Sequence, residues 1–214
     1  MLRILVLLLA SAAGTLAAAS PWPMEKGEGQ LCFSIEAKTG DGSGAYATLY
    51  TEVGVGKGRV VGLDFGQAED DVDKAVLFAR VPFGARGGNS VQAWEMGVGM
   101  VGGELALRPG ISLGQGFQIG ASPGWVALES RAVVFEKGAG IFQTDLTVGA
   151  ETARGNKWMV QLQMGAPSDH DPYVKLAPSF AFKQGKGRHL LLGATAGLVN
   201  IDTVKITFGL WQEF

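Results

Sequence analysis

The sequence is short of the features that usually stabilise or anchor an exported protein. It contains a single cysteine, Cys32, among 214 residues. No disulfide can therefore form within the chain, which excludes the small secreted folds that depend on disulfides. The sequence also has no large excess of positive or negative charge, because 18 basic and 20 acidic residues give a formal net charge of −2. Without a basic patch or an aromatic-lined basic groove, we expect no nucleic-acid partner.

Long apolar runs are equally scarce, and the one near the N-terminus has the form of an export signal. Arg3 precedes an apolar stretch at 4–9, and small residues at 17–19 provide a cleavage site. We predict that residues 1–19 form a cleaved signal peptide and that residues 20–30 form a periplasmic N-terminal segment. Cleavage removes one basic residue and no acidic one, so the net charge changes from −2 to −3. A membrane anchor is the alternative, but the run falls short of the roughly 20 residues of a spanning helix.

Histidine, the commonest catalytic and metal-binding side chain, occurs only twice, as His170 and His189. His170 stands between two aspartates, and adjacent residues rarely converge on one ion, so we expect a solvated loop and no metal site. His189 has no nearby serine in the local pattern that barrel lipases or lipid A deacylases would need. We therefore predict no catalytic residues and no cofactor.

Glycine, in contrast, is abundant and spread along the whole chain, at 33 of 214 residues. This is about twice its average usage, and glycine favours turns, bulges and crowded sheets over helices. Most of the chain after residue 30 alternates apolar and polar residues, for example at 47–55, 94–100, 158–164 and 204–214. The alternation predicts strands of about 10 residues, the length of a tilted membrane-spanning strand. A soluble sandwich or lipocalin-like barrel would show the same alternation with its apolar face inward.

The strand count depends on residues 103–121. One long strand there gives twelve strands, whereas a hairpin turning at 114–116 gives about thirteen, against the even number usual for bacterial barrels. With twelve strands, the longer and more acidic connections fall on one side and the short, basic, glycine-rich ones on the other. We therefore favour twelve strands, with both ends of the chain and the short turns in the periplasm. A helix is the alternative at 70–81, but Pro82 and the local alternation favour a strand.

The last residues, VKITFGLWQEF at 204–214, form an alternating strand that ends on an aromatic residue. They resemble the terminal strand of bacterial outer-membrane β-barrel proteins, in which a C-terminal aromatic, most often Phe, is read by the assembly machinery. The resemblance implies that Phe208, Leu210 and Phe214 form the assembly signal. PWPMEKGEG at 21–29 and AYATLYTEVGVGKGRVVGLDFG at 45–66 resemble small outer-membrane proteins of proteobacteria, which implies no particular activity. The predicted fold class is all-β, an antiparallel up-and-down transmembrane β-barrel of about twelve strands over residues 31–214.

The polar face of these strands carries charges of both signs. An Arg or Lys facing lipid at the membrane centre costs about 2–4 kcal/mol, so we expect these charges in the lumen. The candidate lumen-lining residues are Glu52, Asp64, Arg80, Glu95, Glu104, Arg108, Glu129, Arg131, Asp145, Lys157, Lys175 and Lys205. The mixed signs fit either a narrow, weakly selective pore or an interior closed by salt bridges. Trp94, Trp125, Trp158, Tyr173 and Trp211 lie mostly near predicted strand ends, where an aromatic girdle would meet the membrane surface.

These observations predict a passive, narrow channel for small hydrophilic solutes in the bacterial outer membrane, and not an enzyme. A closed structural or interaction barrel with functional external loops is the alternative. A lipid-modifying enzyme and a soluble periplasmic barrel are less favoured. The expected partners are outer-membrane lipid, lipopolysaccharide and the assembly machinery, with small solutes as candidates for transport.

Overall fold

The structure is a computed structural model that describes residues 21–39, 44–68, 71–84, 89–138 and 140–214. The predicted signal peptide at 1–19 lies outside these residues. The regular elements of the described residues are all strands: β1 (Gly29–Lys38), β2 (Ala45–Gly56), β3 (Arg59–Ala68), β4 (Asp71–Pro82), β5 (Ser90–Val101), β6 (Glu104–Ile119), β7 (Ser122–Phe135), β8 (Gly140–Glu151), β9 (Lys157–Pro167), β10 (Tyr173–Gly185), β11 (Arg188–Val199) and β12 (Val204–Glu213). Within the described ranges, no helix has the length and apolar character needed to cross a membrane.

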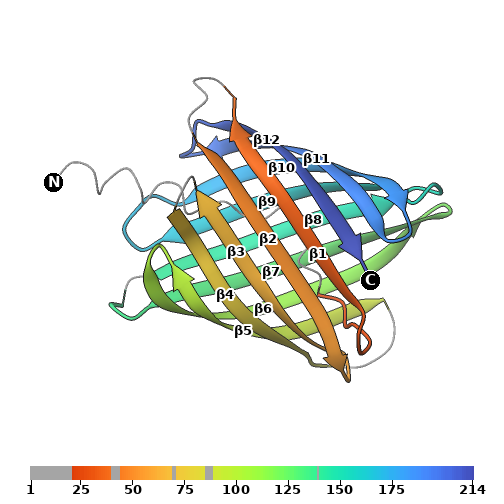
Figure 1. The fold of residues 1–214 in the computed structure, drawn as a ribbon, viewed down its shortest axis with the longest axis horizontal. Coiled ribbons are helices and arrows are strands. Elements are labelled where there is room, and N and C mark those ends of the chain that lie inside the picture. Colours follow the sequence, from red (N-terminus) through yellow and green to blue (C-terminus); the bar gives the residue numbers. More distant parts are fainter. Residues whose placement is uncertain (1–20, 40–43, 69–70, 85–88, 139) are drawn as a thin grey trace.

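Each strand pairs antiparallel with the next, and β12 pairs with β1 to close a barrel (Figure 1). The closing seam aligns Gln30 with Glu213. Beyond it, the backbone N–H of Gly29 donates to the carbonyl of Phe214 over 2.8 Å, and the N–H of Phe214 donates back over 2.9 Å. The predicted antiparallel barrel of twelve strands is confirmed.

The segment 103–121 is one strand. β6 runs for 16 residues, and its Gly114 pairs with Val91 of β5 on one side and Ala127 of β7 on the other. The hairpin alternative at 114–116 is wrong, because neighbours on both edges hold this stretch in the sheet. The helix alternative at 70–81 is wrong for the same reason, since β4 pairs with both β3 and β5.

The connections gather at two opposite mouths of the barrel. One, which we call the terminal mouth, holds the start of β1, the end of β12 and the turns at 57–58, 120–121, 152–156 and 186–187. The other, the loop mouth, holds the end of β1, the start of β12 and the turns at 102–103, 136–138, 168–172 and 200–203. Between β5 and β6, Gly102 and Gly103 have φ values of 58° and 78°. Such positive angles at both residues suit the two-residue turns that join twisted antiparallel strands.

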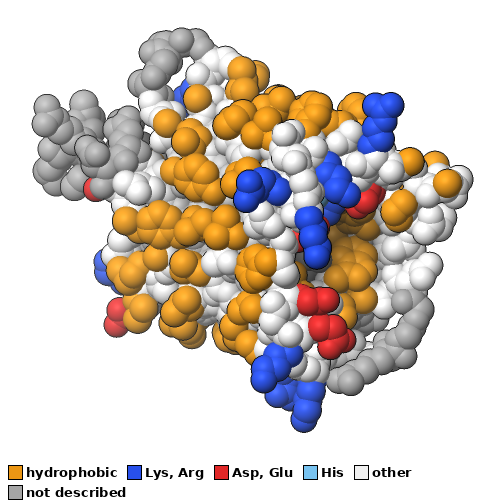
Figure 2. All heavy atoms as spheres, turned by 45° about the vertical axis from the view of Figure 1, so that its right-hand side comes forward, with side chains coloured by type: hydrophobic (Ala, Val, Ile, Leu, Met, Phe, Trp, Pro, Cys, Tyr) orange, Lys and Arg blue, Asp and Glu red, His pale blue; other side chains and the backbone are white. Residues whose placement is uncertain are grey.

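The outer face of the barrel is apolar. Leu77, Trp94 and Phe208 point outward and are 63%, 56% and 55% exposed. Figure 2 shows hydrophobic side chains spread over the outside of the strands, with the charged ones mostly toward the right of the view. Inward positions carry polar residues such as Glu52 and Arg80, which are buried. A lipocalin-like barrel has the opposite arrangement, so that alternative is wrong, whereas a closed sheet with an apolar exterior suits lipid.

Aromatic rings mark the outer face near the terminal mouth. Trp94 stacks on Phe83 with ring centroids 4.9 Å apart. Trp158 meets Phe180 edge-on at 4.4 Å, and Phe180 meets Phe182 at 4.2 Å. Aromatic rings of this kind sit well at the membrane–water interface.

The girdle prediction is wrong for Trp125, Tyr173 and Trp211, whose side chains point into the barrel. Tyr173 and Trp211 are buried at 7% and 6% exposure. Trp125 lies over Gly149, and the Tyr173 ring lies over Gly165. Strand parity decides the direction of these rings, and the inward glycines leave the room that they fill.

The apolar exterior gives a direct test of the membrane setting. Replacing Leu77, midway along β4, with arginine is expected to lower the free energy of unfolding by about 2–4 kcal/mol in a phospholipid bilayer. The same change at Val72, near the loop mouth on the same strand, should cost only about 0–1 kcal/mol. Denaturant unfolding from vesicles measures both. Equal, small effects at the two positions would contradict a lipid-facing exterior.

Candidate functional site

The inner face of the barrel gathers the charged residues of the strands. All twelve predicted lumen-lining residues lie at inward positions of their strands. Seven of them are buried: Glu52, Asp64, Arg80, Glu95, Arg108, Glu129 and Lys175. Glu104 stands apart at the loop mouth, where it pairs with Lys137 over 3.2 Å and both side chains are exposed. The structure therefore brings most of the predicted set into the interior and leaves Glu104 at the rim.

Nine inward charges form one connected group, which we call the ionic cluster. Its members lie on β2 to β8 and are Glu52, Asp64, Lys74, Arg80, Glu95, Arg108, Glu129, Arg131 and Asp145. Glu95 is the centre of the cluster. Its carboxylate lies 3.2 Å from Arg80, 3.4 Å from Arg108 and 3.0 Å from Arg131. Four cations thus face five carboxylates in a space that water barely reaches, where each charge depends on its partners.

Inward glycines let charges two strands apart meet. Glu95 of β5 pairs with Gly110 of β6, and Gly110 pairs with Arg131 of β7. Because Gly110 has no side chain, the Arg131 guanidinium crosses it to reach Glu95. The glycine pattern thereby sets which charges become partners.

An aromatic pair packs against the cations of the cluster. The Phe78 ring stacks on Tyr50 with centroids 5.5 Å apart. The guanidinium carbons of Arg80 and Arg108 lie 5.5 Å and 5.7 Å from the Phe78 centroid. A cation at this distance from a ring face is favourable when water is excluded, so Phe78 helps to hold both arginines in place.

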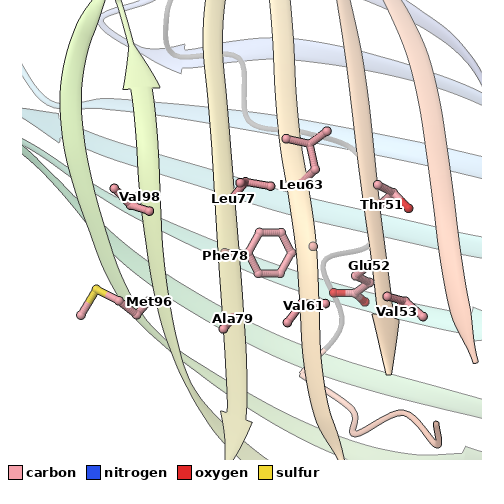
Figure 3. A pocket seen from close by; sticks show the side chains of 11 residues that line it. Thr51, Glu52, Val53, Val61, Leu63, Leu77, Phe78, Ala79, Met96 and Val98 are labelled. Atoms are coloured by element: carbon pink, nitrogen blue, oxygen red, sulfur yellow. The ribbon is translucent and has the colours of Figure 1, made fainter. Parts of the chain in front are cut away.

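Phe78 packs against a glycine of the barrel wall. Its ring reaches from β4 to β3, over Gly62 (Figure 3). Outward residues that include Leu77 and Met96 line a hollow of about 510 Å³ around this point. Gly62 and the ring together close the wall there.

Hydrogen bonds from uncharged donors extend the cluster to the barrel seam. The Glu52 carboxylate accepts from the Gln30 amide over 2.7 Å and from the Tyr50 hydroxyl over 2.8 Å. The Gln30 side-chain oxygen in turn accepts from the Trp211 ring nitrogen over 3.0 Å. One network therefore runs from β12 across the seam to β8 and fixes the inner surface.

The opposite side of the interior carries the three remaining predicted cations, which we call the lysine wall. Lys157, Lys175 and Lys205 lie on β9, β10 and β12. Lys157 pairs with Glu213 at the terminal mouth, and Lys205 lies 3.4 Å from Glu36. The amines of Lys157 and Lys175 also stand 4.1 Å and 4.7 Å from the centroids of inward aromatic rings. This side holds fewer carboxylates than the ionic cluster.

Neither histidine takes part in a catalytic or metal-binding arrangement among the described residues. The buried His189 ring places Nε2 3.1 Å from the carbonyl of Gly155. His170 is exposed at the loop mouth. No group of three or more His, Cys, Asp or Glu side chains in the described part of the chain could hold a metal ion. The expectation of no catalytic residues and no cofactor stays a prediction.

The sequence prediction of lumen-lining residues does not include Lys74, Glu36 or Tyr50, which contact residues that it does include. Lys74 pairs with Asp64 over 2.8 Å, and Glu36 pairs with Lys205. Both have the inward parity of their strands, so the alternation already contained the signal. Tyr50 gave no such signal, because an inward aromatic is indistinguishable from a core residue until its neighbours are known.

The predicted assembly signal lies on the outer face of β12 and just beyond its end. Phe208, Leu210 and Phe214 are 55%, 38% and 61% exposed. Phe214 is also the last residue joined to β1, through its two backbone hydrogen bonds with Gly29. Recognition of these residues by assembly machinery stays a prediction.

Solved structures with the same architecture come from outer-membrane channels. The KdgM porin is 9% identical with a TM-score of 0.65, and the match covers 86% of this chain and 99% of KdgM. The chain has the barrel fold of outer-membrane porins. The NanC porin is 7% identical with a TM-score of 0.68, and the match covers 86% of this chain and 100% of NanC. An outer-membrane channel of Pseudomonas putida F1 is 8% identical with a TM-score of 0.59, and the match covers 94% of this chain and 100% of that channel. No protein-family model and no curated protein matches the sequence.

Proposed function

We propose that the chain is an outer-membrane channel through which small hydrophilic solutes pass passively. The observation that carries this proposal is the division of the barrel between an apolar exterior and a charged interior. The polar inner face lines the lumen and does not contact lipid. It solvates a hydrophilic solute that crosses the barrel. The porin fold of the chain adds support, because structures of that fold are named as porins and channels.

The chain lies in the bacterial outer membrane in this proposal, after cleavage of the signal peptide at 1–19. The terminal mouth faces the periplasm and the loop mouth faces outward, because the terminal mouth holds the two-residue turns at 57–58, 120–121 and 186–187 and barrels of this class keep short turns inside. Assembly machinery reads the C-terminal strand, and lipid and lipopolysaccharide surround the exterior. The aromatic rings around Trp94 and Trp158 would then lie at the periplasmic interface.

The ionic cluster and the lysine wall have different roles in this channel. The cluster pairs its charges with one another, so it acts as a rigid constriction on β2 to β8. The lysine wall offers cations with fewer competing carboxylates, so solutes move along β9 to β12. A narrow path beside a filled half suits small solutes, and this proposal assigns the chain no enzymatic role.

A closed barrel with functional external loops is the second candidate. The ionic cluster favours it, because a salt-bridged interior stabilises a barrel without any solute. The two candidates differ in whether current crosses the lumen.

Single-channel recording in a planar bilayer tests the proposal. We expect discrete current steps from the purified, refolded chain, because the proposed path along the lysine wall carries ions. A chain that shows its heat-dependent gel shift, and hence a folded barrel, but no steps above background would overturn the channel and leave the closed barrel.

A further inference from the structure

Residues 21–28, which we call the N-terminal segment, turn back before β1 begins. Gly27 has a φ of 89°, which suits a tight turn. The N–H of Glu28 donates to the carbonyl of Glu25 over 3.2 Å. The Glu28 carboxylate accepts from the N–H of Glu25 over 2.9 Å. This turn sends the residues before Glu25 back toward the barrel instead of away from it.

The turn is seated on Gly54, an inward position at the end of β2. The N–H of Gly27 donates to the Gly54 carbonyl over 2.9 Å, and the N–H of Gly54 donates to the Glu28 carbonyl over 2.8 Å. A Cβ at Gly54 would collide with the Glu25 carbonyl and stand 2.9 Å from the Cβ of Met24. The missing side chain therefore makes room for the segment.

The segment continues along the inner rim to β6. A Cβ on Gly58 would stand 2.9 Å from the Cβ of Pro23. On Gly114 of β6, a Cβ would stand 2.6 Å from Pro21 and 3.0 Å from Trp22. Pro21 is among the most deeply buried residues of the described chain. The segment therefore spans the terminal mouth from β1 to β6.

The ionic cluster lies directly behind this segment. Two residues deeper than these contacts are Glu52 on β2, whose partner Arg80 lies 3.1 Å away, and Ser112 on β6. These side chains are only 1%, 2% and 1% exposed. The segment thus covers the half of the interior in which buried charges depend most on the exclusion of water.

We infer that the N-terminal segment is a displaceable plug over the β1–β6 side of the terminal mouth, and that its release opens this side of the mouth beside the solute path of the lysine wall. This inference rests on the proposed channel function. Residues 21–26 belong to no strand, so the segment can leave without breaking strand pairing. Pro21 and Pro23 stiffen it and remove two N–H donors, which lowers the cost of seating it.

Two inward glycines provide the test. Gly54→Ala on β2 places a methyl group against the Glu25 carbonyl and Met24 of the segment, whereas the control Gly116→Ala on β6 meets nothing closer than 3.6 Å. Each is made in the full chain with Cys32→Ser and Pro21→Cys. The labelling rate of the new thiol by a membrane-impermeant maleimide reports seating. We expect Gly54→Ala to raise the labelling rate about tenfold, which corresponds to a loss of about 1.4 kcal/mol in the free energy that seats the segment. Gly116→Ala should leave the rate unchanged.

Conductance supplies the second measurement. Deletion of residues 21–26 and the Gly54→Ala change are each expected to raise the single-channel conductance, whereas Gly116→Ala is not. The plug is overturned if a thiol at 21 reacts as fast as one placed at the exposed Lys26. It is also overturned if the deleted chain conducts no more than the intact chain. If no chain conducts, the channel function fails, and the labelling rates alone decide whether the segment is seated.

Discussion

Replacing Arg80 with methionine is expected to lower the free energy of unfolding by about 3–5 kcal/mol. The Arg80 guanidinium lies 3.1 Å from Glu52 and 3.2 Å from Glu95, and all three side chains are almost fully buried. Methionine keeps much of the volume but leaves Glu52 without this partner, and a buried, unpaired carboxylate is expensive. Denaturant unfolding of the barrel in vesicles measures the loss.

Two further variants make this prediction specific. Lys137→Met breaks the exposed pair with Glu104 and should cost about 0–1 kcal/mol. Adding Glu52→Gln to Arg80→Met removes the unpaired carboxylate charge and should recover much of the lost free energy of unfolding. If Arg80→Met costs no more than Lys137→Met, the charges of the ionic cluster are solvated and the constriction does not exist.

Deleting Phe214 is expected to abolish insertion of the barrel into the membrane. The deletion removes both backbone hydrogen bonds that join the chain end to Gly29. It also removes the aromatic residue by which the assembly machinery is expected to recognise β12. The folded fraction, seen as a heat-dependent gel shift in isolated outer membranes, should fall from nearly all of the chain to nearly none.

An outward aromatic elsewhere provides the control for this deletion. Phe142 of β8 is 54% exposed, close to the 61% of Phe214. Phe142→Ala should leave assembly nearly intact, because it removes a similar ring without touching the seam. Normal assembly after deletion of Phe214 would show that neither the seam hydrogen bonds nor the terminal aromatic is needed.

The sequence was sufficient to predict the strands and their faces, because a period of two fixes both. Glu52 and Arg80 could be placed inside for this reason. Their partnership could not be predicted, since it depends on register between strands and on Gly62, which lies opposite Glu52 and leaves the intervening strand without a side chain. Nearness to a strand end does not predict a girdle position for Trp125, Tyr173 and Trp211, because parity decides which face of the sheet a side chain takes. The path of the N-terminal segment carries no periodic signal at all.

The most direct test of the account is to block the lumen chemically. Lys205 of β12 faces inward and its neighbour Ile206 faces outward, at 57% exposure. Each is changed to cysteine in a chain that also carries Cys32→Ser, and a bulky, water-soluble thiol reagent is added during planar-bilayer recording. We predict that the current steps of the Lys205→Cys channel fall on labelling while those of the Ile206→Cys channel do not change. Equal responses at the two positions, or unchanged steps after complete labelling at 205, would contradict passage of solutes through this barrel.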